Sequence, residues 1–279
     1  MCIANQGIAH SPILAKSARS SQQGEKIGMD EDIETTLREL RRAGYVVFKP
    51  QLKPAGLKQG NLYDCQFVPA STLVDHRRSE LIGASAKQIK DRNIVPLNSR
   101  LNWRTLEQAF LSVRNFEGEV WETGVYQGVT ALVLANCIRT YGPSNTVLRL
   151  FDTFHGMPEV NSQKDMHRKG NFADTSVERV RELVGAGVAV TFHEGIIPAT
   201  FQGLEAARLK LVHIDLDLYQ SYIDTLEFCY SRMERGIFVF DDYGTPSCPG
   251  ALEAVDHFFS GRPEAIFCSI TGQAIAIKW

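Results

Sequence analysis

The sequence lacks the features of membrane-bound, secreted and nucleic-acid-binding proteins. It contains no apolar run of about 20 residues, the length that a membrane span requires. Its N-terminus, Met1 to Gly7, has neither the basic nor the apolar region of a secretory signal peptide, so we expect none. The 30 basic and 32 acidic residues give a net charge of −2, which leaves no basic footprint for nucleic acid or an anionic membrane.

Several enzyme motifs are also missing. The six cysteines among 279 residues are scattered and form no C-x-x-C pair, which favours reduced thiols and a cytoplasmic location. There is no G-x-S-x-G nucleophile motif and no complete G-x-G-x-x-G dinucleotide motif. What is present, 44% hydrophobic and 22% charged residues, is typical of a globular enzyme.

Residues 1–95 carry no motif that indicates chemistry. Residues 1–27 are polar and are expected to be mobile. A helix over 31–43, a strand over 45–48, an irregular stretch over 51–75 and a helix around 79–92 are expected to follow. We interpret this part as an accessory cap or a dimerisation region.

Residues 96–279 form the second expected domain, in which strands and helices alternate. After a helix over 103–115, the apolar runs predict strands at 119–122, 147–151, 188–193, 209–214, 237–240, 264–269 and 273–278. Helices are expected between them at 129–140, 175–185, 199–207, 221–234 and 250–259. Alternation of this kind predicts an α/β fold, a mostly parallel sheet with helices on both faces. Ligands bind such sheets at the carboxyl ends of the strands.

Two of the predicted strands end in pairs of carboxylates. Asp215 and Asp217 follow the strand at 209–214, and Asp241 and Asp242 follow the strand at 237–240. Carboxylates beside an apolar core are costly unless they are paired or bind a metal, and oxygen ligands select Mg²⁺, Ca²⁺ or Mn²⁺. Two alternatives remain: solvated loop acids with Asp242 capping a turn, or the D-x-D motif of a glycosyltransferase or phosphatase.

A glycine-containing turn follows the strand at 119–122. It runs Glu122-Thr123-Gly124-Val125-Tyr126-Gln127-Gly128, and its glycines allow a tight turn that a ligand can approach. Asp152, at the end of the next strand, is placed to accept hydrogen bonds from the ribose of a nucleoside. Gly124 and Asp152 are separated by more than the roughly 20 residues typical of NAD sites, which favours a smaller nucleoside ligand.

Three further residues have local interpretations. Ser221 with Asp224 is typical of a capping box at the start of a helix over 222–234. His213 is flanked by apolar residues, so we expect it to lie in the core or behind the site. His193 ends the third strand near the expected position of an adenine ring.

Residues 96–279 resemble the macrocin O-methyltransferase (TylF-type) family, a Mg²⁺-dependent branch of the class I S-adenosylmethionine methyltransferases. The resemblance rests on motifs in the same order: the 122–128 turn, Phe151–Pro158, His213–Tyr219, Asp241–Gly244, Cys248–Ala251, Ala254–Asp256 and Thr271–Ala274. It implies a Rossmann-like fold with a seven-stranded, mostly parallel sheet. It also implies that S-adenosylmethionine and Mg²⁺ are the cofactors.

The resemblance assigns roles to individual residues. It implies that Asp215, Asp241 and Asp242 bind the metal and that Asp217 is the general base. The residues expected around S-adenosylmethionine are Glu122, Thr123, Gly124, Val125, Tyr126, Gly128, Asp152, Thr153, His193, Gly195 and Asp215. The implied partner is a small-molecule acceptor with hydroxyl groups, a sugar or a natural-product scaffold of specialised metabolism. The family is often oligomeric, so a homo-oligomer is considered.

Three other functions compete with this one. A Mg²⁺-dependent catechol or phenol O-methyltransferase would share both cofactors and differ in its acceptor. A D-x-D glycosyltransferase would bind a nucleotide sugar, but the glycine turn would then have no role. A catalytically silent binding or scaffold protein would have no need of all four carboxylates.

Overall fold

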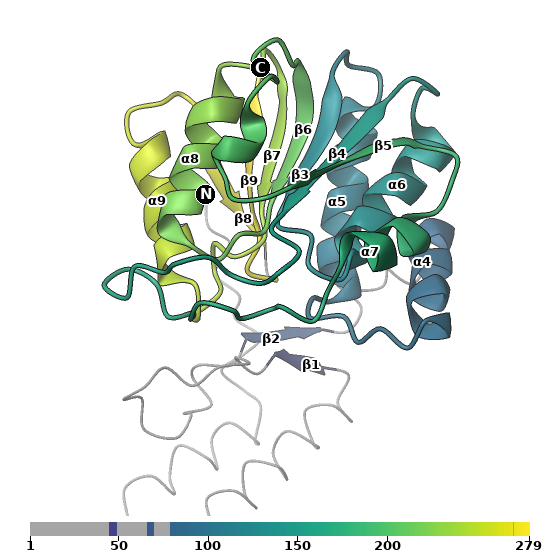
Figure 1. The fold of residues 1–279 in the computed structure, drawn as a ribbon, viewed down its shortest axis with the longest axis horizontal. Coiled ribbons are helices and arrows are strands. Elements are labelled where there is room, and N and C mark those ends of the chain that lie inside the picture. The colour runs from purple at the N-terminus through teal and green to yellow at the C-terminus, as the bar shows by residue number, and fades with distance from the viewer. Residues whose placement is uncertain (1–44, 49–65, 70–78, 270) are drawn as a thin grey trace, which may run out of the picture. The chain divides into compact units, whose positions relative to one another are not determined.

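The computed structural model describes residues 45–48, 66–69, 79–269 and 271–279 (Figure 1). The chain divides into two units, 1–72 and 73–279. In the first unit, strand β1 (Tyr45–Phe48) pairs antiparallel with β2 (Gln66–Pro69). The strand predicted at 45–48 is confirmed, whereas β2 corrects the expectation that 51–75 is wholly irregular. The expected mobile segment 1–27 and the helix at 31–43 lie outside the described residues.

Two helices come before the large sheet. Helix α4 (Glu80–Asp91) starts after Ser79, whose hydroxyl accepts a hydrogen bond from the amide of Ile82. Helix α5 (Arg100–Val113) starts with a capping box between Ser99 and Asn102. Apolar side chains of both helices join those of α6 (Val129–Tyr141) in one core. Helix α4, although it lies before the domain boundary expected at residue 95, thus packs with the second unit.

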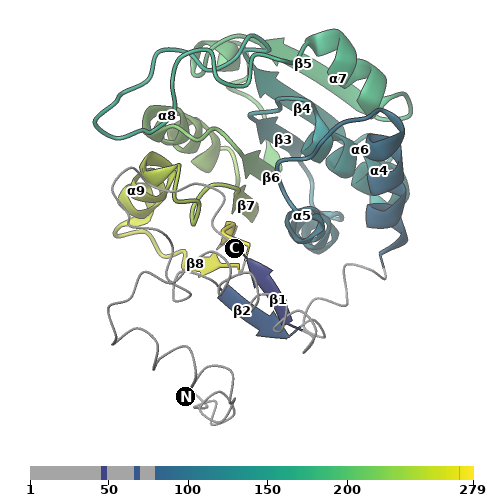
Figure 2. The ribbon, with the colours of Figure 1, turned by 90° about the horizontal axis from the view of Figure 1, so that it is seen from below.

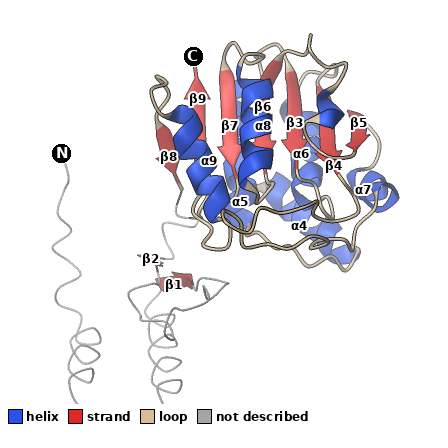
Figure 3. Ribbon diagram, turned by 60° about the vertical axis from the view of Figure 1, so that its left-hand side comes forward, coloured by secondary structure: helices blue, strands red, loops and turns tan. Residues whose placement is uncertain are grey.

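The large sheet has seven strands in the order β5-β4-β3-β6-β7-β9-β8. In chain order they are β3 (Glu119–Thr123), β4 (Val147–Asp152), β5 (Ala189–Glu194), β6 (Leu209–Ile214), β7 (Gly236–Phe240), β8 (Ile266–Cys268) and β9 (Ala274–Lys278). The first five pair in parallel, while β9 runs antiparallel to both β7 and β8. Figure 3 shows the reversed direction of β9 beside β7. The predicted seven-stranded, mostly parallel sheet is confirmed.

Apolar residues alternate between the two faces of the sheet, as the period of a β-strand requires. On β7, Val239 enters one core and Phe238 and Phe240 enter the other. Helices α4, α5, α6 (Val129–Tyr141) and α7 (Val177–Val184) cover one face, and α8 (Tyr219–Tyr230) and α9 (Pro249–Phe259) cover the other (Figures 1 and 2). Among the described helices, none combines the length and apolar character needed to cross a membrane.

Two of the predicted helices differ from the structure. Only a short 3₁₀ turn, η3 (Ala199–Phe201), forms where a helix over 199–207 is expected, because the chain leaves the helical conformation at Gln202, with a ψ of 131°, and then turns through Gly203, with a positive φ of +83°. Helix α8 begins at Tyr219, so Ser221 lies inside its first turn and does not cap it. The residue before α8, Leu218, makes no side-chain cap.

Candidate active site

The carboxyl ends of the central strands continue into the site residues through main-chain hydrogen bonds. The amide of Asp215 donates to the carbonyl of Thr123 at 2.8 Å, and the amide of Asp241 donates to that of Ile214 at 2.9 Å. On the other side of β3, the amide of Gly195 donates to the carbonyl of Asp152 at 2.9 Å. The ladder therefore brings the acids and the turn after β3 to one edge of the sheet.

A buried histidine connects three strands at this edge. Nδ1 of His213 lies 3.0 Å from Oε1 of Glu122, and its Nε2 lies 3.4 Å from Oδ1 of Asp241. Burial lowers the pKa of His213, but the hydrogen bonds to Asp241 and Glu122 raise it to about 9. His213 is therefore a cation at neutral pH that donates to both carboxylates, and it has no lone pair to offer a metal.

The carboxylates at this edge form a concentrated negative charge. Burial raises the pKa of Asp215 well above its usual range, and the neighbouring Asp241, Asp242 and Asp217 raise it further. Among the described residues, none donates a hydrogen bond to the Asp215 side chain. Ligand atoms of Asp215 and Asp241 lie within 4.8 Å of each other in one group with His213. An all-oxygen set under mutual repulsion fits a hard divalent cation, which would relieve the repulsion.

Two residues outside the predicted set hold these carboxylates in place. Nε2 of Gln273, just before β9, donates to Oδ1 of Asp241 at 2.6 Å. The hydroxyl of Tyr222 on α8 donates to Oδ2 of Asp242 at 3.0 Å, as does the amide of Asp217. Both Tyr222 and Gln273 are wholly buried. Asp242 is not among the side chains whose ligand atoms lie within 4.8 Å of one another with those of Asp215 and Asp241. Its Oδ2 is engaged in these two hydrogen bonds.

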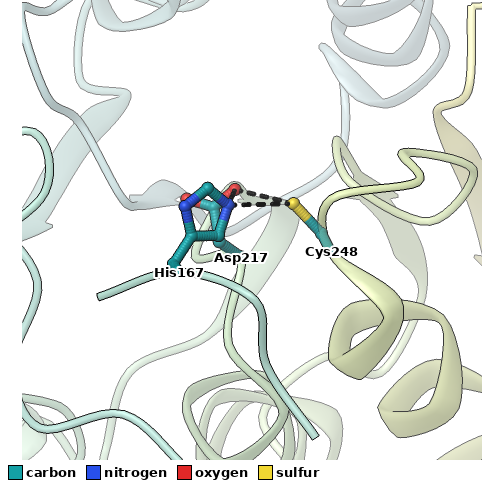
Figure 4. A group of neighbouring side chains, drawn as sticks. All are labelled: His167, Asp217 and Cys248. Carbon is teal, nitrogen blue, oxygen red and sulfur yellow. Dashed lines mark hydrogen bonds and ion pairs between the residues drawn. The ribbon is translucent and has the colours of Figure 1, made fainter. Parts of the chain in front are cut away.

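Asp217 lies in a tight turn between β6 and α8, with a positive φ of 61°. Its Oδ1 accepts a hydrogen bond from the thiol of Cys248 at 2.9 Å and lies 3.5 Å from Nε2 of His167 (Figure 4). Burial raises the pKa of Asp217, while the bond from Cys248 and the charge of His167 lower it, with a net rise. Among the described residues, no hydrogen bond reaches Oδ2, which leaves that oxygen able to accept a proton.

The turn after β3 is shaped by two glycines and held by Asp152. Gly124 and Gly128 have φ values of +83° and +82°, and Gly128 is the N-cap of α6. Oδ2 of Asp152 accepts hydrogen bonds from the amides of Val125 and Tyr126 at 2.7 and 2.8 Å. Its Oδ1 accepts from the amide of Phe154 at 2.7 Å. Asp152 thus holds the main chain of the turn as well as lying at the expected ribose position.

Of the remaining residues predicted to bind the cofactor, some lie beside the turn or Asp152, and His193 lies apart from them. Thr153 follows Asp152 directly, and its hydroxyl donates to the carbonyl of Gly156 at 2.6 Å. Tyr126 donates to Oδ1 of Asp174 at 2.7 Å, which ties the turn to the loop before α7. His193 instead stacks on Phe151 with ring centroids 4.5 Å apart. Within the described residues, no hydrogen bond connects His193 to the turn.

A buried acid beside this turn has one oxygen without a partner. Glu122 is 0% exposed, and among the described residues nothing donates to its Oε2. An orphaned buried carboxylate oxygen is costly. It fits a site that receives a hydrogen-bond donor or a positive charge from a ligand.

The residues that sequence reasoning missed lie far from the motifs or carry no local signal. His167 belongs to the long loop between β4 and α7, about which the sequence shows no periodic pattern. Tyr222 has the appearance of an ordinary helical core residue. Cys248 and Gln273 lie within segments that carry the family resemblance, and that was the one signal able to find them.

Comparison with known proteins identifies the family. The family model for Macrocin-O-methyltransferase (TylF) matches residues 99–262, more than half of the chain. The chain belongs to this family. Its membership leaves the glycosyltransferase alternative without support.

The curated relatives of the chain are O-methyltransferases, by their names. The chain is 31% identical over 157 residues to the 8-demethyl-8-(2,3-dimethoxy-alpha-L-rhamnosyl)-tetracenomycin-C 4'-O-methyltransferase of Streptomyces olivaceus. It is 28% identical over 158 residues to the demethyldecarbamoylnovobiocin O-methyltransferase of Streptomyces niveus. Each match covers 52% of this chain and 59% of the relative, so the chain spans little more than half of their length.

Solved structures show the class I O-methyltransferase fold. The O-methyltransferase NovP superimposes with a TM-score of 0.54 at 24% identity, over 63% of this chain and 78% of that one. The calicheamicin methyltransferase CalS11 gives 0.54 at 19% identity, over 72% and 91%. At these identities the likeness establishes the fold, and the chemistry rests on the site residues.

Proposed function

We propose that the chain is a Mg²⁺-dependent S-adenosylmethionine O-methyltransferase that acts on a hydroxyl of a sugar or natural-product scaffold. The observation that carries this proposal is the convergence of Asp215, Asp217, Asp241 and Asp242 on the strand edge beside the Gly124 turn, in a member of this family. The catechol or phenol alternative would share this site and differs only in its acceptor.

The proposed S-adenosylmethionine site runs from Glu122 to Gly195 along the strand edge. Glu122 offers the unpaired Oε2, and Asp152 has carboxylate oxygens that can accept ribose hydroxyls in addition to amides. The full proposed set is that of the sequence: Glu122, Thr123, Gly124, Val125, Tyr126, Gly128, Asp152, Thr153, His193, Gly195 and Asp215. S-adenosylmethionine supplies the methyl group that passes to the acceptor oxygen.

Asp215, Asp241 and Asp242 are the proposed metal ligands. All three side chains offer only oxygen ligands, which suits a divalent cation such as Mg²⁺. Burial and, after it, the neighbouring carboxylates raise the pKa values of Asp215 and Asp242, and a bound cation would relieve this repulsion. The cation would lower the pKa of the acceptor hydroxyl and orient it. His213 and Gln273 position Asp241, and Tyr222 positions Asp242.

Asp217 is the proposed general base. Cys248 occupies its Oδ1, which fixes the carboxylate plane and leaves Oδ2 to take the proton of the acceptor hydroxyl. The raised pKa of Asp217 makes it a stronger base than an exposed aspartate. Apart from proton transfer, the protein would contribute to the rate mainly by positioning the acceptor oxygen for attack on the methyl group.

The names of the relatives support the acceptor class. They include methyltransferases for a rhamnosyl-tetracenomycin, for a novobiocin precursor and, in Micromonospora griseorubida, for mycinamicin III at the 3'' position. The first of these names places a rhamnosyl group on the acceptor. We therefore expect the methylated hydroxyl of this chain's acceptor to belong to a sugar or natural-product scaffold.

The proposal also covers the location, the partner and the oligomeric state of the protein. Among the described residues, four cysteines are free thiols, which supports a reducing, cytoplasmic setting: Cys137, Cys229, Cys248 and Cys268. The proposed partner is a small hydroxylated acceptor and not a nucleic acid. Whether the protein is a homo-oligomer is decided by light scattering of the purified chain.

The test is calorimetric titration with S-adenosylhomocysteine, with and without Mg²⁺ and EDTA, followed by an acceptor panel. We expect binding that survives EDTA, and methyl transfer to an acceptor with a sugar or natural-product hydroxyl that EDTA abolishes. Asp217→Asn serves as the matched variant that binds the product without turnover. Absence of S-adenosylhomocysteine binding under all conditions would overturn the proposal, and transfer only to catechols would move the acceptor to the aromatic class.

A further inference from the structure

Three side chains with three different donor atoms meet beside the proposed metal site. Nε2 of His167, Oδ1 of Asp217 and Sγ of Cys248 all lie within 4.8 Å of one another (Figure 4). They come from separate parts of the chain: the loop between β4 and α7, the turn between β6 and α8, and the N-cap of α9. The cluster contains nitrogen, oxygen and sulfur, whereas the proposed Mg²⁺ ligands are oxygen alone.

The spacing of these atoms matches a tetrahedral zinc site. Zinc bound at about 2.3 Å from sulfur and about 2.0–2.2 Å from nitrogen and oxygen places its ligand atoms about 3.4–3.6 Å apart. In the structure, Nε2 of His167 lies 3.5 Å from Sγ of Cys248 and 3.5 Å from Oδ1 of Asp217. The Sγ–Oδ1 separation is 2.9 Å, a hydrogen bond that the ion would replace by opening it about 0.6 Å.

The cluster is held in place without an ion. Cys248 is 1% exposed at the start of α9, and the His167 ring packs against Phe172 with centroids 5.5 Å apart. Near His167, the carboxylate of Asp165 accepts the amide of Tyr219 at 2.9 Å, which fixes the loop to the start of α8. A three-ligand site that is preassembled binds its ion without first ordering the chain.

Access to solvent completes the requirements of such a site. The side chains of His167 and Asp217 are 14% and 17% exposed, so an ion can enter from that side and keep a water as its fourth ligand. The ion binds the thiolate, so the Cys248 proton passes to solvent as the zinc–sulfur bond forms. Sulfur and imidazole donors favour zinc over magnesium.

We propose that His167, Asp217 and Cys248 form a second metal site, which binds Zn²⁺ through Oδ1 of Asp217 and thereby lowers the affinity of that carboxylate for a proton. The binding of zinc stands on the cluster alone. Its inhibitory consequence rests on the proposed function, because it requires Asp217 to be the base. Zinc bound at this site therefore inhibits the enzyme without competing with Mg²⁺ for its ligands.

The test of the site measures metal binding directly on the full, untagged chain. Zn²⁺ is titrated in competition with a chromogenic chelator, and Co²⁺ is used as a spectroscopic probe of a thiolate ligand. We expect one equivalent of Zn²⁺ and a thiolate-to-cobalt charge-transfer band. Because loss of an outer partner of a metal site already costs about 10–100-fold in affinity, Cys248→Ser and His167→Ala should each lose at least about 100-fold.

Cys268→Ser is the matched control, since Cys268 is an exposed free thiol outside the cluster. It should bind both ions as the wild type does. Wild-type zinc affinity in both Cys248→Ser and His167→Ala, or a charge-transfer band that survives in Cys248→Ser, overturns the site. His167→Ala keeps the test decisive if the change at the buried Cys248 prevents folding.

The inhibitory step is tested separately, at saturating Mg²⁺. We expect one equivalent of Zn²⁺ to stop methyl transfer by the wild type and by Cys268→Ser, while S-adenosylhomocysteine binding is unchanged. The residual activity of His167→Ala should require at least about 100-fold more Zn²⁺ for the same inhibition. Equal zinc sensitivity in this variant overturns the inhibitory role. If no acceptor is methylated at all, the proposed function fails, and the binding titration still decides the site.

Discussion

Glu122 on β3 and His213 on β6 are register partners across a parallel pair, and their buried side chains meet at 3.0 Å. The other nitrogen of the same imidazole faces Asp241 after β7. One protonated histidine therefore connects the proposed cofactor end of the site with its proposed metal end, through three adjacent strands.

Replacing this histidine should destabilise the fold. In His213→Ala, Glu122 and Asp241 stay buried without their shared cation, and breaking a buried pair costs about 3–5 kcal/mol. Urea denaturation measures the change in the free energy of unfolding. His257→Ala, at an exposed histidine bonded to Tyr219, is the control and should lose at most about 1 kcal/mol. A similarly small loss in His213→Ala would contradict the pairing.

Gly124→Ala should be far more harmful than its φ angle alone explains. A Cβ at Gly124 would lie 1.7 Å from the carbonyl oxygen of Asp215, so the turn and the strand edge must separate. We expect a loss of about 2–5 kcal/mol, since overpacking adds to the strain of a left-handed alanine. Gly203→Ala has the same φ of +83° with no atom within 4 Å, and thermal denaturation should show only the smaller strain cost of about 1–2 kcal/mol.

Asp217→Asn should separate chemistry from binding. Asparagine keeps an oxygen for the thiol of Cys248 but cannot accept the acceptor proton, so the methyl-transfer rate should fall by about 10²–10⁴-fold. S-adenosylhomocysteine affinity, measured by calorimetry, should stay near the wild-type value. A large loss of that affinity with little loss of rate would show that Asp217 serves binding and not proton transfer.

Asp241→Asn should remove the metal dependence of the reaction. The substitution keeps the size of the side chain and reduces the negative charge available to a divalent cation. Activity is expected to fall at least about 100-fold and to respond no further to Mg²⁺. Glu227→Gln, an exposed carboxylate on α8, is the control for a change of charge. Full Mg²⁺-dependent activity in Asp241→Asn would exclude this residue from the metal site.

Glu119 should contribute to stability against acid. Burial raises the pKa of Glu119, but hydrogen bonds from Arg149 and Trp121 outweigh it and hold the pKa below its usual value. A lowered folded pKa gives stability that is present above the unfolded pKa, near 4.5, and is lost as the pH falls through the folded value. Glu119→Gln should therefore cost about 1–3 kcal/mol at pH 7 and less below pH 4, as urea denaturation at several pH values would show. An equal cost at every pH would contradict this origin.

The centre of the sheet was predictable because β6 and β7 are short, mainly apolar runs that are followed by acids, and side chains on both of their faces are buried. The helix expected over 199–207 was not excluded by local pattern, since Phe201 and Leu204 have helical spacing. The extended ψ of Gln202, followed by the left-handed Gly203, ends the helical conformation after Phe201. The start of α8 was misplaced because Ser221 resembles a cap, although Leu218 takes that position without a side-chain bond.

The acids of the site followed from strand order, because parallel strands deliver their carboxyl ends to one edge. The residues that surround these acids could not be predicted in this way. His167 approaches Asp217 through a loop whose path depends on Asp165 binding the start of α8. Tyr222 and Gln273 are buried polar residues whose partners are set by helix and strand packing, which no spacing in the sequence encodes.

The position of β9 has a consequence for the order of events during synthesis. Strand β9, residues 274–278, leaves the ribosome after every other strand of the sheet, yet it is the strand that joins β8 to β7. Until it arrives, β8 has no neighbour in the sheet and Asp241 lacks the amide of Gln273. The segment that carries the family match, 99–262, is by then already translated. The strand edge that carries the proposed metal ligands is therefore complete only once this late strand has been made.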